Sequence, residues 1–261
     1  MCLISLAIEQ HPQYPFILVA NRDEFFQRPT APLHFWEDNP DILAGRDMEA
    51  GGTWLGIHRS GRWAAVTNYR DPTQPIGELS RGALVVDYLT SHQSANEWCH
   101  TLRDRAAKYS GFNLIVGHFL TKEICYFSNR ENQIREIPTG MMTFSNGQLE
   151  DQWPKMRRLQ ETFKQQLTLD NLSDTKTLIS LLHNTAHAEQ HELPQTGIPL
   201  DLEQQLSSLF IKPFKTPKNI MYGTRSSAMV ALNRNGQVSF IEQTFDENGQ
   251  LALETHHALE V

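Results

Sequence analysis

Residues 2–24 read CLISLAIEQHPQYPFILVANRDE and contain two apolar runs separated by a segment with two prolines. The runs at 2–8 and 16–21 predict two strands that pair with each other, because the turn between them is short. The uninterrupted apolar residues at 16–20 are typical of a strand that is covered on both faces. The chain is therefore expected to begin with a buried pair of strands.

The rest of the chain alternates between groups of strands and groups of helices. Apolar spacing predicts helices that begin near Ser80, Ser94 and Pro154, and further helices at 174–186 and 201–209. Residues 22–52 are expected to be irregular, because prolines interrupt them repeatedly. Strand patterns occur at 53–57, 63–67, 112–119, 122–128, 133–138, 141–144, 227–233, 237–245 and 251–257.

This order predicts an α+β fold in which antiparallel sheets pack face to face beneath helices. A doubly wound parallel sheet would alternate strand and helix more regularly, and the chain contains no Gly-rich nucleotide-binding motif. No repeat, linker or low-complexity stretch divides the sequence. Residues 1–261 are therefore expected to form a single domain.

Composition narrows the classes of function. The formal net charge of −7 argues against a general binder of nucleic acid or anionic membranes. No apolar run approaches the roughly 20 residues of a membrane helix, and no basic region of a secretion signal precedes the first apolar run. Cys2, Cys99 and Cys125 form no C-x-x-C pair, which suits a reducing compartment. We expect a soluble, cytoplasmic protein without an integral membrane segment.

Cys2 is the main candidate for a catalytic group. Aminopeptidases remove Met1 when the next side chain is small, and Cys2 would then carry both a thiol and a free α-amine. An α-amine with a pKa of roughly 7.7–8.0 can accept the proton of a thiol with a pKa of about 8.5. This is the logic of N-terminal-nucleophile catalysis. The competing interpretation is that Cys2 is buried for packing alone, and its position by itself favours that interpretation.

Polar residues at the ends of predicted strands are candidates for the rest of the site. Arg22, Asp23 and Glu24 directly follow the second apolar run, and strand pairing would return them towards Cys2. An arginine beside a thiol lowers its pKa, and a carboxylate can hold an α-ammonium group. Without a nearby Cys2, the same residues describe a solvated turn with a surface ion pair.

Two asparagines and one arginine complete the candidates. Asn68 and Asn146 lie at strand ends, where a side-chain amide can donate to an oxyanion, although asparagine also favours turns for local reasons. Arg225 precedes an apolar strand and either binds a substrate carboxylate or phosphate or caps the sheet.

A histidine repeat and two further cysteines receive structural interpretations. His183, His187 and His191 have the spacing of metal ligands on a helix, but the predicted helix ends within the repeat. We interpret them as a solvated face and expect no metal site. Cys99 and Cys125 lie within apolar patterns, so we expect them in the core.

An ordered set of short motifs resembles the NRDE family, whose members are also called transport and Golgi organization protein 2 homologues. The four residues N-R-D-E alone are a weak signal, whereas the set runs in matching order from residue 2 to about residue 232. The motifs are Met1-Cys2, Asn21-Arg22-Asp23-Glu24, Gly51-Gly52-Thr53-Trp54-Leu55-Gly56, Thr67-Asn68-Tyr69-Arg70, Phe112-Asn113-Leu114, Ser145-Asn146 with Trp153-Pro154-Lys155, Leu193-Pro194-Gln195-Thr196-Gly197 and Tyr222-Gly223-Thr224-Arg225.

The resemblance implies a fold similar to that of N-terminal-nucleophile hydrolases, with four layers in the order αββα and mostly antiparallel sheets. The related cysteine acylases, such as penicillin V and bile-salt amidases, use an N-terminal cysteine with an arginine and an aspartate just downstream. Here Arg22 and Asp23 are adjacent, whereas the acylases separate the two by two residues. Both Asp23 and Glu24 therefore stay open for the role of the carboxylate.

These observations predict a cysteine amidase or acylase that hydrolyses a non-peptide C–N bond in a small-molecule amide or acyl substrate, without a cofactor. The predicted catalytic residues are Cys2, Arg22, Asp23, Asn68 and Asn146, and the predicted substrate-binding residues are Glu24 and Arg225. Eukaryotic members of the family have been linked to heme trafficking and lipid homeostasis. The alternative is therefore a non-catalytic protein that binds heme or a lipid on the same fold, and a scaffold with neither activity is a third possibility.

Overall fold

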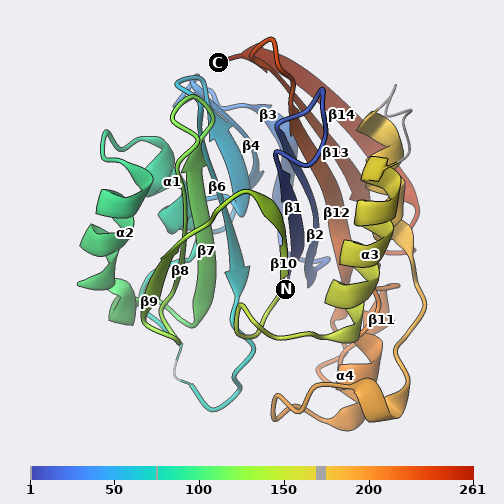
Figure 1. Ribbon diagram of the computed structural model, residues 1–261. Helices are drawn as coiled ribbons and strands as arrows, with labels where there is room; N and C mark the ends of the chain where they lie inside the picture. Colours follow the sequence, from blue (N-terminus) through green and yellow to red (C-terminus); the bar gives the residue numbers. More distant parts are fainter. Residues whose placement is uncertain (1, 75, 169–174) are drawn as a thin grey trace. The chain divides into compact units, whose positions relative to one another are not determined.

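The computed structural model describes residues 2–74, 76–168 and 175–261 (Figure 1). It is a mixed α+β structure with mostly antiparallel sheets, which confirms the predicted fold class. Two compact units can be distinguished, Met1–Gln27 with Thr139–Ala258 and Arg28–Pro138 with Leu259–Val261. Each unit is described by itself, and the single domain expected over residues 1–261 stays a prediction.

The first unit is built on a sheet with the strand order β10-β1-β2-β12-β13-β14, and β11 pairs with β12. Its neighbouring strands β1, β2 and β12 are antiparallel. The strands are β1 (Cys2–Ile8), β2 (Phe16–Phe25), β10 (Gly140–Phe144), β11 (Phe214–Lys215), β12 (Met221–Leu232), β13 (Gln237–Phe245) and β14 (Leu251–Glu260).

Helix α3 (Pro154–Thr168) packs against one face of this sheet (Figure 1). Its buried Leu159 and Phe163 join a core with Leu3 of β1, Val19 of β2 and Met229 of β12. The other helical segments of this unit are η2 (Thr175–His183), η3 (Gln190–Glu192) and α4 (Leu200–Gln205). Leu3 therefore turns its side chain to the face that α3 covers, and Cys2, the residue before it, turns to the other face.

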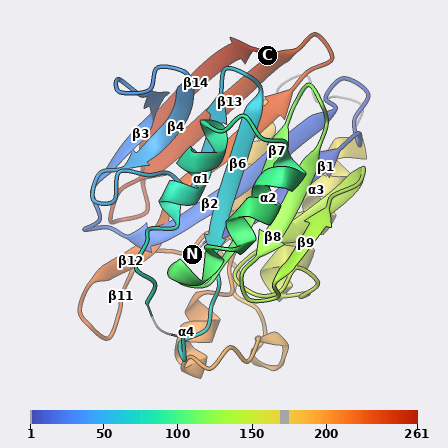
Figure 2. The same ribbon diagram turned by 90° about the vertical axis from the view of Figure 1, so that its left-hand side faces the viewer.

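The second unit contains a sheet whose strands follow one another in chain order from β3 to β9. Helices α1 (Gly82–Leu89) and α2 (Ala95–Arg103) lie over one face of it, followed by η1 (Ala106–Lys108) (Figure 2). Cys99 and Cys125 are both fully buried in the core between α2 and this sheet, as expected. The strands are β3 (Thr30–Phe35), β4 (Ile42–Asp47), β5 (Leu55–His58), β6 (Arg62–Asn68), β7 (Phe112–His118), β8 (Ile124–Ser128) and β9 (Gln133–Glu136).

Local signals near Ser80, Ser94 and Pro154 each marked the start of a helix. The side chain of Ser94 caps α2 in a reciprocal capping box with Glu97, and Pro154 is the first residue of α3. α1 begins at Gly82, and the residue at its N-cap is Arg81 rather than Ser80 and makes no side-chain cap hydrogen bond.

The expectation of an irregular segment at 22–52 is also wrong. β2 continues to Phe25, and β3 and β4 both lie within this range. Pro32 is tolerated because β3 is the last strand of its sheet and its pairing register shifts between Ala31 and His34. A proline at an edge or a bulge removes no essential ladder hydrogen bond.

The two helices expected late in the chain are shorter than predicted. The described part of 174–186 is the 3-10 helix η2, and residue 174 lies outside the described residues. The helix expected at 201–209 ends at Gln205. Beyond it the chain turns, and the backbone N–H of Phe210 donates to the carbonyl of Asn184.

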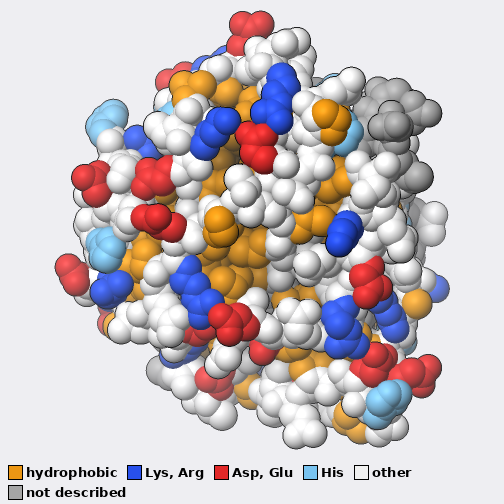
Figure 3. All heavy atoms as spheres, in the orientation of Figure 1, with side chains coloured by type: hydrophobic (Ala, Val, Ile, Leu, Met, Phe, Trp, Pro, Cys, Tyr) orange, Lys and Arg blue, Asp and Glu red, His pale blue; other side chains and the backbone are white. Residues whose placement is uncertain are grey.

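Charge is spread over the surface that Figure 3 displays, where acidic and basic side chains are interspersed. None of the helices in the described ranges combines the length and the hydropathy that crossing a membrane requires.

Candidate active site

The start of β1 lies in register with the polar ends of β2 and β12. Cys2 is opposite Arg22, and Arg22 is opposite Ser226. Directly opposed residues of antiparallel strands point to the same face of a sheet. The Cys2 and Arg22 side chains therefore share a face, and it is the face opposite to the one that Leu3 contributes to the α3 core.

β10 holds the backbone of Cys2 from the other side. The single proton of the Ser145 hydroxyl is shared between the Cys2 carbonyl oxygen at 2.8 Å and the Asn146 side-chain oxygen at 3.1 Å. Asn146 is fully buried. This contact orients the amide with its oxygen towards Ser145, so that Nδ2, the atom an oxyanion requires, lies on the other side of the group.

The residue Cys2 is 6% exposed. Burial raises the pKa of the Cys2 thiol above its ordinary value. The ammonium group at the start of the chain and, to a smaller extent, Arg22 lower this pKa, whereas the carboxylates of Asp23 and Glu24 raise it further. The chain begins with Met1, so the Cys2 nitrogen is an amide here and becomes an amine only when Met1 is removed.

Arg22 and Glu24 form an ion pair on the face that Cys2 occupies. Their side-chain atoms approach to 3.6 Å, and the side chains are 8% and 22% exposed. Residues two apart in a strand point to the same face, which explains why these two meet. Glu24 thus partly neutralises the arginine that favours the thiolate of Cys2.

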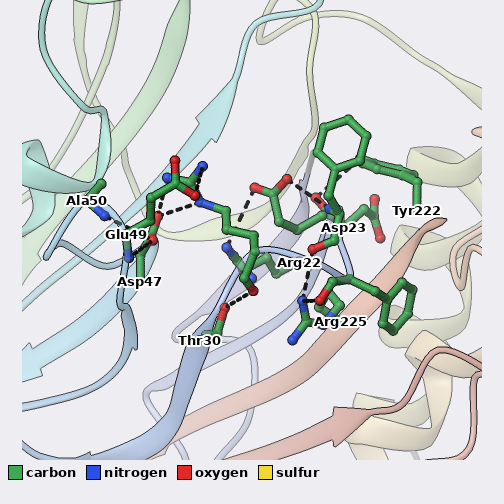
Figure 4. Close-up of polar contacts among 12 residues, drawn as sticks. Arg22, Asp23, Thr30, Asp47, Glu49, Ala50, Tyr222 and Arg225 are labelled. Atoms are coloured by element: carbon green, nitrogen blue, oxygen red, sulfur yellow. Dashed lines mark hydrogen bonds and ion pairs between the residues drawn. The ribbon is translucent and has the colours of Figure 1, made fainter. Parts of the chain in front are cut away.

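Asp23 points to the opposite face and is held there by β12. Its Oδ1 accepts a hydrogen bond of 2.8 Å from Thr224, and its backbone carbonyl accepts one of 3.2 Å from the Tyr222 hydroxyl (Figure 4). Asp23 is 2% exposed and comes one residue beyond the Cys2–Arg22 pair. It nevertheless raises the pKa of the Cys2 thiol more than Glu24 does.

Arg225 occupies a β-bulge. The register between β2 and β12 shifts between Thr224 and Ser226, so Arg225 is the extra residue. Its Nη1 donates to the carbonyls of Phe25 at 2.9 Å and Phe26 at 3.2 Å (Figure 4). Burial and the nearby charge of Arg22 lower the pKa of Arg225, whereas Glu24 raises it. The two arginines and Glu24 therefore form one cluster.

Asn21, the first residue of the N-R-D-E motif, is a structural link. Its amide nitrogen donates to the carbonyls of Leu182 and Leu209, both at 2.9 Å, and its oxygen accepts from Ser227 at 2.6 Å. The fully buried amide ties β2 to β12 and to the segments that contain Leu182 and Leu209.

Asn68 and the histidine repeat are the remaining residues that the sequence analysis singled out. Asn68 is the last residue of β6 in the other unit and is half-buried, so its catalytic role stays a prediction.

In the histidine repeat, His183 packs edge-on against Phe210 and Phe245. His187 and His191 are exposed, as the solvated-face interpretation predicted for them, but His183 is half-buried. Within the described ranges, no three His, Cys, Asp or Glu residues gather as metal ligands would.

Three residues that sequence reasoning passed over contact the candidate residues directly, namely Ser145, Tyr222 and Thr224. All three lie in the quoted motifs that contain Asn146 or Arg225. Adjacency within those motifs was the available signal, but the pairing partner of each residue depends on long-range register.

A family model described as Transport and Golgi organisation 2 matches residues 1–247. The chain belongs to this family. The mouse Transport and Golgi organization 2 homolog is 31% identical over 269 residues, covering 98% of this chain and 97% of its own length. The human homolog is 32% identical over 259 residues, covering 94% and 93%, respectively. The Drosophila melanogaster Transport and Golgi organization protein 2 is 28% identical and covers 94% of this chain and 92% of its own length.

Solved structures establish the fold of this member of the Transport and Golgi organisation 2 family. A mutant conjugated bile acid hydrolase from Clostridium perfringens matches with a TM-score of 0.56 at 10% identity, covering 100% of this chain and 92% of that chain. A second variant of that hydrolase gives a TM-score of 0.54 at 8% identity with the same coverage. These neighbours are N-terminal-nucleophile hydrolases, so the predicted fold type is confirmed, and at such low identity the likeness concerns the fold alone.

Proposed function

We propose that this protein is a cysteine amidase or acylase that uses Cys2, exposed by removal of Met1, to cleave a non-peptide C–N bond in a small molecule. The observation that carries the proposal is the register at the start of β1. It opposes Cys2 to Arg22 and brings the acidic pair Asp23 and Glu24 next to it. A cysteine at the first position of a buried strand, beside the charged end of the neighbouring strand, is an arrangement suited to a fixed nucleophile.

Each group has a distinct role in the proposed reaction. The α-amine of Cys2 accepts the thiol proton, and the sulfur attacks the substrate carbonyl. Asp23 holds the α-ammonium group, and Arg22 favours the thiolate against the effect of burial. Asn146 donates to the oxyanion, with Asn68 as the second candidate donor. Glu24 and Arg225, which form one cluster with Arg22, contact the substrate.

The bonds balance over two steps. In the first step a carbon–sulfur bond forms, the C–N bond breaks, and the leaving amine takes the proton from the α-ammonium group. In the second step water attacks the thioester, the carbon–sulfur bond breaks, and the thiol and a carboxylic acid are released.

The solved neighbours support this assignment by fold and by residue type. Their names state that they hydrolyse conjugated bile acids, and the two proteins carry a replaced cysteine and a replaced arginine. Cysteine and arginine are the residue types that Cys2 and Arg22 contribute here. The names of the relatives in the Transport and Golgi organisation 2 family state no reaction. The substrate therefore has to be found by experiment.

Intact-mass measurement tests the proposal directly. Protein expressed without an N-terminal tag should lack Met1, and incubation with a set of acyl anilides and fatty-acid amides should add one acyl group to the chain. Cys2→Ala should abolish the acyl adduct, whereas Cys99→Ala, which alters a buried thiol of the other unit, should retain it. Retention of Met1, or acylation that persists in Cys2→Ala, would contradict the mechanism.

The heme- or lipid-binding alternative predicts a different outcome. Saturable binding of heme or of a fatty acid, together with no acyl adduct from any amide, would favour a binding protein on the same fold.

A further inference from the structure

The motif Tyr222-Gly223-Thr224-Arg225 pairs with the charged end of β2. Thr224 is opposite Asp23, Gly223 is opposite Glu24, and Tyr222 is opposite Phe25. Segments about 200 residues apart in the chain therefore form one structural element. Of the four residues, only Arg225 has a role in the proposed reaction.

Thr224 occupies the centre of this pairing and is fully buried. Its hydroxyl lies 2.8 Å from Asp23 Oδ1, and it also accepts the backbone N–H of Ile211 at 2.8 Å. A hydroxyl has a single proton, and the Ile211 N–H can only donate. The threonine proton must therefore be given to the Asp23 carboxylate, which makes a charge-assisted hydrogen bond.

The backbone on both sides of Thr224 is also held closely. Its own N–H donates to the Ile211 carbonyl at 3.0 Å. At Gly223 an added Cβ would lie 3.0 Å from the Ile211 oxygen and 3.1 Å from Pro213 Cα, so a larger residue would have to displace the backbone of this segment. The Tyr222 hydroxyl, finally, donates to the carbonyl of Asp23 itself. Neither Thr224 nor Asp23 has room to turn independently.

We propose that Thr224 is a positioning residue that orients the Asp23 carboxylate so that it holds the α-ammonium group of processed Cys2. This inference rests on the proposed function, because the α-amine exists only after Met1 is removed. It also assigns the two carboxylates different tasks. Asp23, held by Thr224, serves the amine, and Glu24, paired with Arg22, lies on the face of the thiol.

The test uses full-length protein that begins at Cys2, produced by a tag protease if Met1 is not removed in the cell. An aldehyde that condenses with both the amine and the thiol of an N-terminal cysteine reports the pKa of the α-ammonium group through the pH dependence of its rate. Thr224→Val keeps the shape but removes the donor and should lower the pKa of the α-ammonium group. Thr224→Ser keeps the hydroxyl and should restore it.

A matched control lies in the same sheet. Thr143→Val also removes one buried hydroxyl, the one that contacts Ser5, and should leave the pKa of the α-ammonium group unchanged. If the amidase proposal holds, Thr224→Val should slow formation of the acyl-enzyme by about 10- to 100-fold, the range found when a hydrogen bond behind a site residue is lost. The loss should appear in the acylation rate rather than in substrate affinity.

An unchanged pKa of the α-ammonium group in folded Thr224→Val would overturn the inference. If Thr224→Val does not fold, the wild-type protein decides the question. The NMR resonance of the buried Thr224 hydroxyl should move when the α-ammonium group titrates, and a resonance that does not respond would overturn the inference equally. Failure of the amidase proposal has a separate signature, because no acyl adduct forms while the pKa of the α-ammonium group still responds to Thr224.

Discussion

At the scale of single residues, the environment of Cys2 opposes its reactivity until the chain is processed. Burial disfavours the thiolate, and Asp23 and Glu24 disfavour it further. Arg22 is the nearby side chain that acts in the opposite direction. Removal of Met1 would place an ammonium group on Cys2 itself, and a positive charge at that distance favours the thiolate. Processing would then turn a packed cysteine into a nucleophile.

The rate of Cys2 alkylation should therefore depend on processing. In protein that retains Met1, the midpoint of the rate against pH should lie above the usual thiol value of about 8.5, and it should fall when Met1 is removed. Iodoacetamide labelling followed by peptide mass spectrometry measures the rate at Cys2 apart from the buried Cys99 and Cys125. A midpoint at or below the usual value with Met1 retained would contradict the raised pKa.

The choice between Asp23 and Glu24 is a second prediction at this scale. Asp23→Asn should slow acylation of processed Cys2 by about 100-fold, because the α-ammonium group loses its carboxylate. Glu24→Gln should slow it by about 10-fold or less, because Glu24 is partly solvated and pairs with Arg22. The rate of acyl-enzyme formation, followed by intact mass, compares the two variants, and the reverse order would assign the role to Glu24.

At the scale of elements, the ends of strands carry most of the polar contacts described above. The end of β4 offers a second example, in the other unit. Arg28 contacts Asp47 through Nε at 2.8 Å and Nη2 at 2.7 Å, and the backbone N–H groups of Glu49 and Ala50 donate to Oδ1 (Figure 4). Burial alone would raise the pKa of Asp47, but the bonds from Arg28, Ala50 and Glu49 outweigh it and lower the pKa below its usual value.

This lowered pKa predicts how stability depends on pH. The ionised form of Asp47 is favoured in the folded state, so its contribution is complete above the unfolded-state pKa of about 4 and is lost as pH falls through the folded-state pKa. Asp47→Asn should cost about 1 kcal/mol at neutral pH, after allowing for solvent screening of a partly exposed pair. Urea unfolding at neutral and acidic pH should show that this difference shrinks in acid.

Asp41→Asn is the matched control for this experiment. Asp41 pairs with Arg59 at 3.8 Å, and both side chains are more than half exposed. Such a pair contributes little, so Asp41→Asn should leave the free energy of unfolding nearly unchanged at both pH values. If the two variants lose equal free energy of unfolding, the contacts of Asp47 at the end of β4 stabilise the fold no more than an exposed ion pair does.

At the scale of the whole molecule, the likeness to family relatives extends over nearly the full chain, whereas the likeness to the hydrolases concerns the fold.

The net charge of −7 and the interspersed surface charges in Figure 3 limit the kinds of partner that the protein can attract. Neither feature provides the concentrated positive potential that recruits polyanions.

This surface should therefore not bind polyanions. At an ionic strength of about 0.15 M, where charges further apart than about 8 Å are screened, the protein should not co-sediment with vesicles rich in anionic lipid and should not retard duplex DNA on a gel. A basic DNA-binding domain provides the positive control. Saturable binding that weakens steeply with salt would reveal a basic site that the net charge conceals.

Much of the fold followed from local patterns in the sequence. The apolar runs at the start of the chain predicted the pairing of β1 with β2, and Ser94 and Pro154 marked the starts of two helices, because caps and prolines act within one turn. The place of Cys2 after Met1 allowed an N-terminal nucleophile, although that position by itself favoured packing. The neighbours of Cys2 were also correctly expected within its own strand pair, since a short turn leaves little choice of register.

Only the tertiary structure separated Asp23 from Glu24 and identified Thr224. A shift of one residue in register turns every side chain to the other face of a sheet, and the register between β2 and β12 joins segments far apart in the chain. The bulge at Arg225 shifts that register once more, and no local pattern encodes it. The sequence thus determined which residues could form a site around Cys2. Long-range strand pairing decided which of them share the face of Cys2 and which side chain holds Asp23 in place.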